Sequence, residues 1–213
     1  MNDSSQINVG LMGLGVVGGG VASVLLEHPE DIFSKTGKSI HLKRILVKDV
    51  SKPRDESIPK DMITSNPEDI LDDPSIQIVV EVMGGSDPAR TLLERCLSQG
   101  KHVVTANKEV ILKYGPELQE VADENNACLL YEASVCGAIP VINALSSPLL
   151  ANNIQNIRGI INGTSNYILT DMAQHQASFQ DALKEAQKLG YAEADPTNDV
   201  DGFDAVYKLS ILA

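Results

Sequence analysis

The stretch INVGLMGLGVVGGGV, residues 7–21, decides the fold. Its first six residues form a short apolar run typical of a buried strand, and the run enters glycines spaced as Gly13-x-Gly15-x-x-Gly18. The residues that follow have helical spacing as far as Pro29, which ends the helix. A strand that passes through such a glycine loop into a helix is the context of the dinucleotide-binding fingerprint.

Each glycine of this loop has its own physical role. Gly13 permits the tight turn, Gly15 lets the backbone approach a pyrophosphate, and Gly18 lets the helix pack on the strand. The helix N-terminus supplies N–H donors and a positive partial charge, so an acidic chain of net charge −12 can still hold an anionic cofactor. We predict a nicotinamide dinucleotide site here that includes Val16 and Val17; the alternative is a glycine-rich turn without a ligand.

Strands and helices alternate along the first part of the chain. A polar, loop-like segment at 51–65 interrupts the pattern, and Asn66 and Asp87 are the expected N-caps of two helices. Strands are expected at 7–12, 41–50, 76–83, 101–107 and 127–134, and helices at 16–28, 67–71, 88–99 and 115–126. This alternation predicts an α/β fold of the Rossmann type, a doubly wound parallel sheet.

The regular alternation of strands and helices ends near residue 135. Helices are expected at 137–145, 164–174 and 178–190, with one strand at 154–163 that lacks the aliphatic run of the earlier strands. We therefore expect two domains: an NAD(P)-binding domain at 1–134, and a second domain at 135–213 whose strand belongs to a different sheet.

The end of the second strand is where a dinucleotide's ribose is read, with an acid favouring NAD and a base accommodating the extra phosphate of NADP. This segment carries Lys48, Lys52 and Arg54 beside Asp49. Three cations within seven residues of an acidic protein favour NADP, with NAD also tolerated. The alternative is a solvated turn.

The last 24 residues, GYAEADPTNDVDGFDAVYKLSILA at 190–213, crowd carboxylates together before a lysine. A calcium loop with Gly202 at its sixth position would begin at Thr197 and end at Lys208, so it fails at both ends. Asp204 and Lys208 lie four residues apart, hence on one helical face, among apolar neighbours. This pattern indicates a polar site against a core, able to bind a zwitterion; a solvated acidic loop is the alternative.

Composition narrows the class of protein. Aromatic residues make up 4% with no Trp, and the net charge is −12, which argues against nucleic-acid binding. No apolar run is long enough for a bilayer, and MNDSSQINVG has no signal-peptide pattern. Cys96, Cys128 and Cys136 form no C-x-x-C pair, so we expect reduced, buried thiols in a cytoplasmic protein.

Six motifs carry a resemblance to one family. They are GLGVVG at 13–18, EVMGG at 81–85, TANK at 105–108, EASVCGAIPVI at 132–142, GIINGTSNYIL at 159–169 and GYAEADPTNDVDGFDAVYKLSIL at 190–212. In this order, over essentially the whole chain, the sequence resembles the homoserine dehydrogenases. The resemblance implies hydride transfer with NAD(P) between L-homoserine and L-aspartate 4-semialdehyde, in a homodimer. It also implies that the second domain, at 135–213, is part of an α+β substrate-binding and dimerisation domain. The chain then stops before this domain is complete, so this span alone is not expected to be fully active.

The resemblance further implies residue roles. Lys208 is the proton donor and acceptor, oriented by Asp204, and Lys108 flanks the reacting oxygen with it. Glu193 and Asp204 hold homoserine, with support from Asp199. Cofactor contacts are added at Gly84, Lys108 and Gly190. A monovalent cation, Na⁺ or K⁺, is held mainly by backbone oxygens of Glu132, Val135, Gly137 and Ile139.

Two other functions remain in competition. A dinucleotide-sensing module would share the glycine loop, but it has no need of Lys108, Lys208 and Glu193 together. Another dehydrogenase of small amino-acid aldehydes could share the fold and the lysines, but not the long acidic stretch.

Overall fold

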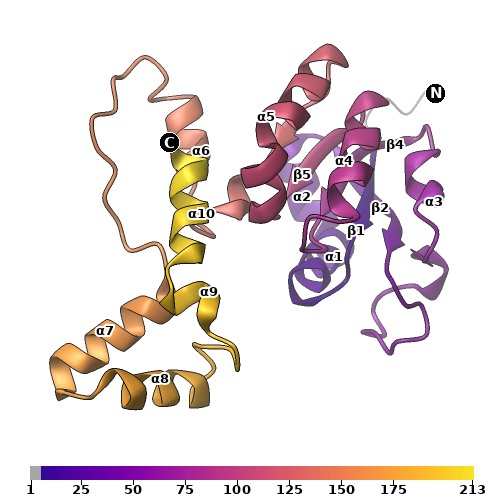
Figure 1. Cartoon of the computed structure of the whole chain (residues 1–213). Coiled ribbons are helices and arrows are strands. Elements are labelled where there is room, and N and C mark those ends of the chain that lie inside the picture. Colours follow the sequence, from indigo (N-terminus) through magenta and orange to yellow (C-terminus); the bar gives the residue numbers. More distant parts are fainter. Residues whose placement is uncertain (1–5) are drawn as a thin grey trace. The chain divides into compact units, whose positions relative to one another are not determined.

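The structure, a computed structural model, describes residues 6–213 of the chain (Figure 1). It divides into two compact units, the first running to Ser134 and the second spanning Val135–Ala213.

The first unit is built on a six-stranded parallel sheet of order β3-β2-β1-β4-β5-β6. The strands are β1 (Gln6–Met12), β2 (Ser39–Leu46), β3 (Ile63–Thr64), β4 (Ile76–Glu81), β5 (His102–Thr105) and β6 (Leu129–Leu130). Strand β1 lies between β2 and β4, so the strand order reverses beside it. In open parallel sheets this reversal is where ligands bind, outside the carboxyl ends of the strands.

Helices connect these strands (Figure 1). They are α1 (Val16–Glu27), α2 (Pro29–Thr36), α3 (Glu68–Leu71), α4 (Ala89–Ser98) and α5 (Lys108–Glu124), with 3₁₀ turns η1 (Lys60–Met62) and η2 (Glu132–Ser134). Leu11, Ile45 and Val79 have no exposed surface, as expected for strands covered on both faces. The fold class expected from the alternation is therefore confirmed.

Several local predictions for this unit were wrong. Residues 51–65 contain η1 and β3, whose two residues are too few to show a sequence period. Asp87 is not the N-cap of α4, which begins at Ala89 after Pro88 and has no side-chain cap. Helix α5 begins at Lys108 rather than near 115, because Asn107 caps it by accepting from Val110 N at 3.2 Å.

The second unit consists of helices within the described residues. They are α6 (Val141–Ser146), α7 (Gly163–His175), α8 (Phe179–Lys188), α9 (Thr197–Val200) and α10 (Phe203–Leu212). Its small core joins α7 to α8 through Ile168, Ala182 and Ala186. The rings of Tyr167 and Tyr191 stack beside this core, with centroids 4.8 Å apart.

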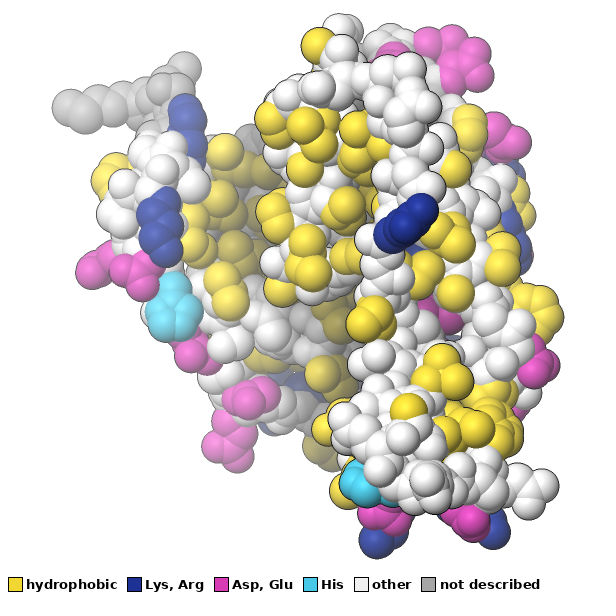
Figure 2. All heavy atoms as spheres, turned by 90° about the vertical axis from the view of Figure 1, so that its left-hand side faces the viewer, with side chains coloured by type: hydrophobic (Ala, Val, Ile, Leu, Met, Phe, Trp, Pro, Cys, Tyr) yellow, Lys and Arg dark blue, Asp and Glu magenta, His cyan; other side chains and the backbone are white. Residues whose placement is uncertain are grey.

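The strand expected at 154–163 does not form. Residues 151–162 have no helix or strand, since a strand without a neighbour leaves its backbone groups unpaired. Ile154, Ile157 and Ile160 of this segment stay exposed, Ile160 at 76%. In Figure 2, hydrophobic side chains are spread over the face of the second unit that is turned to the viewer. The β part of the expected α+β domain thus does not lie within 135–213.

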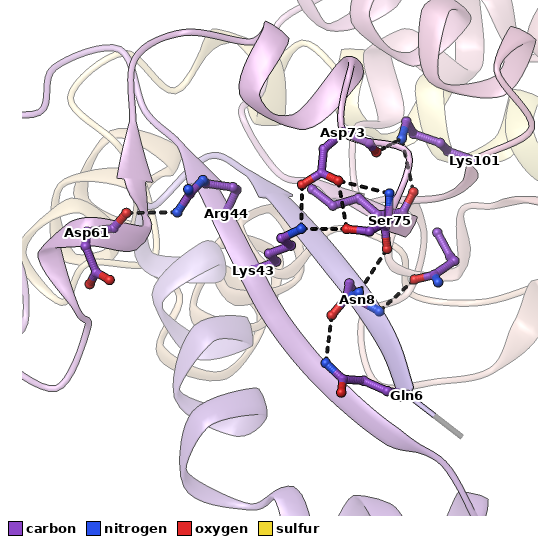
Figure 3. Close-up of polar contacts among 10 residues, drawn as sticks. Gln6, Asn8, Lys43, Arg44, Asp61, Asp73, Ser75 and Lys101 are labelled. Carbon is purple, nitrogen blue, oxygen red and sulfur yellow. Dashed lines mark hydrogen bonds and ion pairs between the residues drawn. The ribbon is translucent and has the colours of Figure 1, made fainter. Parts of the chain in front are cut away.

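Polar side chains tie the amino ends of the central strands together (Figure 3). Lys43 Nζ on β2 lies 2.7 Å from Asp73 Oδ2 and donates to Ser75 Oγ at 2.5 Å. Asn8 Nδ2 on β1 donates to the Ser75 carbonyl at 3.0 Å, and Lys101 Nζ to the Asp73 carbonyl at 2.5 Å. The Lys43 ammonium and the Ser75 donors lower the pKa of Asp73 to about 2. This cluster lies at the edge of the sheet opposite the glycine loop.

Two further predictions concerned membranes and thiols. No helix within residues 6–213 combines the length and the apolarity that a membrane crossing requires. The three cysteines are free, as expected, but only Cys96 is fully buried; Cys128 is exposed and Cys136 half-buried. Burial raises the pKa of the Cys96 thiol to about 12.

Candidate active site

The glycine loop has the geometry of a phosphate cradle. Gly13 has φ +102°, and a Cβ there would lie 2.8 Å from the Val82 carbonyl oxygen. A Cβ on Gly18 would run into the carbonyl oxygen of Gly13. Around Gly15, by contrast, no atom lies within 4 Å of a built Cβ. The fold therefore requires Gly13 and Gly18, whereas the space over Gly15 is open to a ligand.

The first turn of α1 is uncapped and exposed. No side chain caps it, and Val16 and Val17 are 96% and 58% exposed. The first N–H groups of a helix have no partner within the helix and attract anions. An uncapped helix start flanked by exposed apolar side chains and an open glycine suits a dinucleotide's pyrophosphate.

Arg54 reaches from the loop after β2 to the glycine loop. Its Nη1 donates to the Leu14 carbonyl at 2.5 Å, and its Nη2 to the Asp49 carbonyl at 3.3 Å. Its Nε is buried without a hydrogen-bond partner among the described residues. Lys48 and Lys52 are exposed on the same loop. The guanidinium is thus held beside the glycine loop with donor capacity left over, which fits a phosphate on the adenosine ribose.

In the second unit, Lys208 and Asn162 both contact Asp204, and Asn162 also contacts Asp199. Lys208 Nζ lies 2.6 Å from Asp204 Oδ2 and donates to the Ile161 carbonyl at 2.7 Å. Asn162 Nδ2 donates to Asp199 Oδ1 at 2.7 Å and to Asp204 Oδ2 at 2.9 Å. Asp204 is buried, and Lys208 is partly exposed. The cluster therefore holds a partly exposed lysine side chain against a buried, oriented carboxylate.

Local sequence explains this arrangement. Asp204 and Lys208 face each other because they are one helical turn apart on α10. Asn162 is the N-cap of α7, with Oδ1 accepting from Ser165 N at 2.7 Å, which leaves Nδ2 for the carboxylates. Ser165 Oγ also donates to the Asp199 carbonyl at 3.1 Å, so α7 and α9 are joined at the site.

The other predicted substrate and cofactor residues of this unit lie nearby in sequence but outside the cluster. Glu193 is exposed, and the contact that fixes the chain there is its backbone carbonyl, which accepts from Gln187 Nε2 at 3.1 Å. Gly190 follows α8 with φ +81° and is exposed. The structure thus gathers Asp199, Asp204 and Lys208 but leaves the Glu193 side chain apart from them.

In the first unit, Lys108 and Gly84 lie at the carboxyl ends of neighbouring strands. Lys108 is the first residue of α5, after β5, and Gly84 follows β4 with φ +77°. Both are placed where open parallel sheets bind ligands. Lys108 and Lys208 belong to different units.

The predicted cation ligands fall at the end of the first unit and the start of the second. Glu132 lies in η2, and Val135, Gly137 and Ile139 alternate with Cys136 at φ 50° and Ala138 at φ 67°. No group of three or more His, Cys, Asp and Glu side chains in the described residues could hold a metal ion, and a site of backbone oxygens would not form such a group. The monovalent cation stays a prediction.

Sequence reasoning missed two residues. Asn162 was overlooked, although an Asn directly before a helical pattern signals an N-cap. Glu81 was overlooked too, although a carboxylate at the end of a continuous apolar strand must find hydrogen-bond partners when buried. Neither signal reveals which groups the side chain contacts.

Parallel strand order, glycine loop and bare helix start together define a dinucleotide-binding protein of the Rossmann type. The homoserine dehydrogenase NAD-binding domain family matches residues 13–132, and the homoserine dehydrogenase family matches residues 140–213. The chain belongs to the homoserine dehydrogenase family.

Individual relatives agree with this assignment. A homoserine dehydrogenase of Bacillus subtilis is 44% identical over 207 residues, which are 97% of this chain and 48% of the relative. A crystal structure of a homoserine dehydrogenase from Thiobacillus denitrificans has 49% identity and a TM-score of 0.89 over 97% of this chain and 48% of its own. A hyperthermophilic archaeal homoserine dehydrogenase in complex with NADPH has 29% identity and a TM-score of 0.80, over 97% and 68% respectively. The chain spans about half the length of the curated relatives it matches.

Proposed function

We propose that this chain carries the cofactor-binding unit and the lysine–carboxylate cluster of an NAD(P)-dependent homoserine dehydrogenase, interconverting L-homoserine and L-aspartate 4-semialdehyde. The observation that carries the proposal is the Lys208–Asp204–Asn162 cluster in a chain that also holds an open dinucleotide cradle. A dinucleotide sensor has no use for such a cluster. A dehydrogenase of another small aldehyde would not be expected to keep the acidic stretch around it.

The first unit would hold the cofactor through residues already described. The loop from Gly13 to Gly18, with Val16 and Val17, receives the pyrophosphate, and Gly84 and Lys108 contact the nicotinamide half. Arg54, with Lys48 and Lys52, receives the ribose phosphate, so we propose NADP as the preferred cofactor, with NAD accepted. A bound nicotinamide would supply hydride acceptance in oxidation and hydride donation in reduction.

The second unit would supply the proton chemistry. Oxidation of an alcohol needs a base for the hydroxyl proton, and the 2.6 Å contact with Asp204 orients Lys208 Nζ for this role. We assign Lys108 a catalytic role as well, as a second cation at the reacting oxygen. In reduction, the same ammonium groups stabilise the developing alkoxide.

Substrate recognition follows from charge. The ammonium of homoserine calls for carboxylates, and we assign this contact to Glu193 and Asp204, with Asp199 supporting Asp204 through Asn162. Gly190 approaches the cofactor. A monovalent cation on the backbone oxygens of Glu132, Val135, Gly137 and Ile139 would stabilise this region.

Three broader assignments complete the proposal. The whole protein acts as a homodimer, supported by the exposed apolar surface of the second unit. It works in the cytoplasm, supported by the free thiols of the described residues. Its reaction belongs to the biosynthesis of threonine, methionine and isoleucine.

The test is a spectrophotometric assay with homoserine and either NADP or NAD, following absorbance of the reduced nicotinamide. It should be run on this chain and on a fusion to the part of the Bacillus subtilis relative that the chain does not match. We expect turnover in the fusion, faster with NADP. A fusion that folds and binds NADPH but does not oxidise homoserine would leave the sensor as the better interpretation.

A further inference from the structure

Glu81 is a buried carboxylate to which the proposed mechanism gives no task. It is the last residue of β4 and has no exposed surface. Its Oε1 accepts from Met83 N at 2.8 Å, and its Oε2 accepts from Thr105 Oγ1 at 2.6 Å. Asn107 Nδ2 approaches Oε1 at 3.4 Å. These three donors are neutral, so the carboxylate is held by hydrogen bonds and not by an ion pair with them.

These donors come from two different loops. Met83 is the second residue of the loop after β4, where Gly84 and Gly85 both have positive φ, +77° and +74°. Thr105 ends β5, and Asn107 follows it. One carboxylate therefore fixes the first residues of two neighbouring loops, at the carboxyl ends of adjacent strands.

Asn107 closes the connection between the loops. Its Nδ2 donates to the Gly85 carbonyl at 2.7 Å, and its backbone N–H donates to Thr105 Oγ1 at 2.9 Å. Its Oδ1 caps α5 by accepting from Val110 N. These contacts among Glu81, Met83, Gly85, Thr105 and Asn107 form a ring. Lys108 is the first residue of α5, so the position of Lys108 depends on how this ring holds the start of the helix.

The position of the ring in the sheet assigns it to one half of a dinucleotide. A dinucleotide lies across the point where the strand order reverses, here between β1 and β4. Arg54 and the glycine loop lie on the β2 side and serve the adenosine half. The loops after β4 and β5 lie on the other side and would face the nicotinamide half.

We propose that Glu81 is a positioning residue for the nicotinamide half of the cofactor: it holds the Met83–Gly85 loop and the Asn107–Lys108 turn in one arrangement. This inference rests on the proposed function and adds to it a residue that makes no contact with substrate or cofactor. The inference predicts that loss of Glu81 weakens binding of the nicotinamide half of the cofactor and leaves binding of the adenosine half unchanged.

Two ligands separate the halves. NADPH spans both, whereas adenosine 2′,5′-bisphosphate offers only the adenosine half with its ribose phosphate. Calorimetric titration of this chain should show Glu81→Ala binding NADPH at least about tenfold more weakly, since buried donors lose their acceptor. Affinity for adenosine 2′,5′-bisphosphate should stay within about twofold, because Glu81 contacts none of the adenosine-side residues.

A conservative variant tests whether geometry is what matters. In Glu81→Gln, the amide oxygen can still accept from Met83 N, and its NH₂ can donate to Thr105 Oγ1, so NADPH affinity should return to within about threefold of the wild type. In the unliganded chain, hydrogen exchange at the Met83 and Val110 amides should quicken in Glu81→Ala and stay slow in Glu81→Gln.

Controls keep the inference open to refutation. Glu68→Ala, at a carboxylate paired with Arg95 at 2.6 Å elsewhere in the unit, should bind both ligands normally. If Glu81→Ala does not fold, Thr105→Val removes a donor from the same ring. Equal weakening of both ligands, or of neither, in the folded variants overturns the inference. A wild-type chain that binds neither ligand refutes the proposed function itself, and the inference with it.

Discussion

Asn162 and Lys208 meet at the same carboxylate oxygen, Asp204 Oδ2, the first at 2.9 Å through a neutral amide and the second at 2.6 Å through an ammonium. The Asn162 amide also donates to Asp199 Oδ1, so this one side chain contacts two carboxylates. A neutral donor therefore lies between the two carboxylates and contacts both. Lys208 therefore has a fixed partner while it remains partly exposed.

Asn162→Asp should destabilise the chain at neutral pH. An Asp can still cap α7, but it cannot donate to Asp199 and Asp204, and it places a third carboxylate beside them. The added repulsion and the two lost hydrogen bonds should lower the melting temperature of the variant by several degrees. Melting curves at neutral pH measure it. Asn166→Asp, exposed on the same helix, is the control, and equal stability of both variants at neutral pH would contradict the prediction.

Lys208→Arg and Lys208→Ala should both cut turnover of the active fusion by about a hundredfold or more, the range expected when a general acid–base group is lost. Arg keeps the ion pair with Asp204 but does not release its proton near neutral pH. NADPH affinity should not change, because Lys208 lies in the second unit. Steady-state kinetics measure the effect, with Lys188→Ala on α8 as the control. Normal turnover in Lys208→Arg would leave the lysine a purely electrostatic role.

Gly15→Ala should separate cofactor binding from folding. No atom lies within 4 Å of a Cβ built there, so the melting temperature should hold, while the methyl group would occupy the space of the pyrophosphate. NADPH affinity should fall roughly tenfold or more, about 1.4 kcal/mol. Gly20→Ala, one turn along α1 and equally unobstructed, should bind normally. Intrinsic fluorescence of NADPH reports binding. An unchanged affinity in Gly15→Ala would show that the pyrophosphate does not bind over Gly15.

Arg54→Ala should weaken NADPH far more than NADH. Loss of a charge-assisted hydrogen bond to the ribose phosphate costs about 1.5–3 kcal/mol, roughly 10- to 150-fold in affinity. NADH lacks that phosphate, so its affinity should change by less than about threefold. Arg44→Ala, which removes a contact of Nη1 with the Asp61 carbonyl at 3.0 Å, controls for loss of an arginine in the same unit. Equal losses for both cofactors would show that Arg54 acts through the glycine loop alone.

Acid should weaken the sheet through Asp73. Its pKa is lowered from 3.8 to about 2, chiefly by Lys43, so its stabilising contribution is present above about pH 4 and is lost as pH falls towards 2. Asp73→Asn should therefore lower the free energy of unfolding by about 1 kcal/mol at pH 7 and have little effect near pH 2. Urea unfolding at the two pH values compares the variants. If the free energies of unfolding of the variant and the wild type still differ at pH 2, the difference comes from packing and not from the charge of Asp73.

The sequence revealed the parts of the fold that repeat a pattern. The glycine loop, the long apolar strands and the acidic stretch each carry a local signal, and the Asp204–Lys208 contact follows from helical spacing alone. Strand β3 has two residues and no period, and the strand expected at 154–163 depended on neighbours that the pattern could not supply. The Arg54–Leu14 contact and the ring around Glu81 join residues far apart in sequence, so they required the fold.

Strand β1 comes first in sequence among the strands of the described residues, and it is one of the two central strands of the sheet. Its partner β4 ends only at Glu81, and the outermost β6 at Leu130. Ribosomes add roughly 5–20 residues per second. Several seconds therefore pass between synthesis of β1 and synthesis of β4, and during this time one edge of β1 is unpaired. Unpaired strand edges recruit other strands. The central pair of the sheet can therefore form only after the chain has been made as far as residue 81.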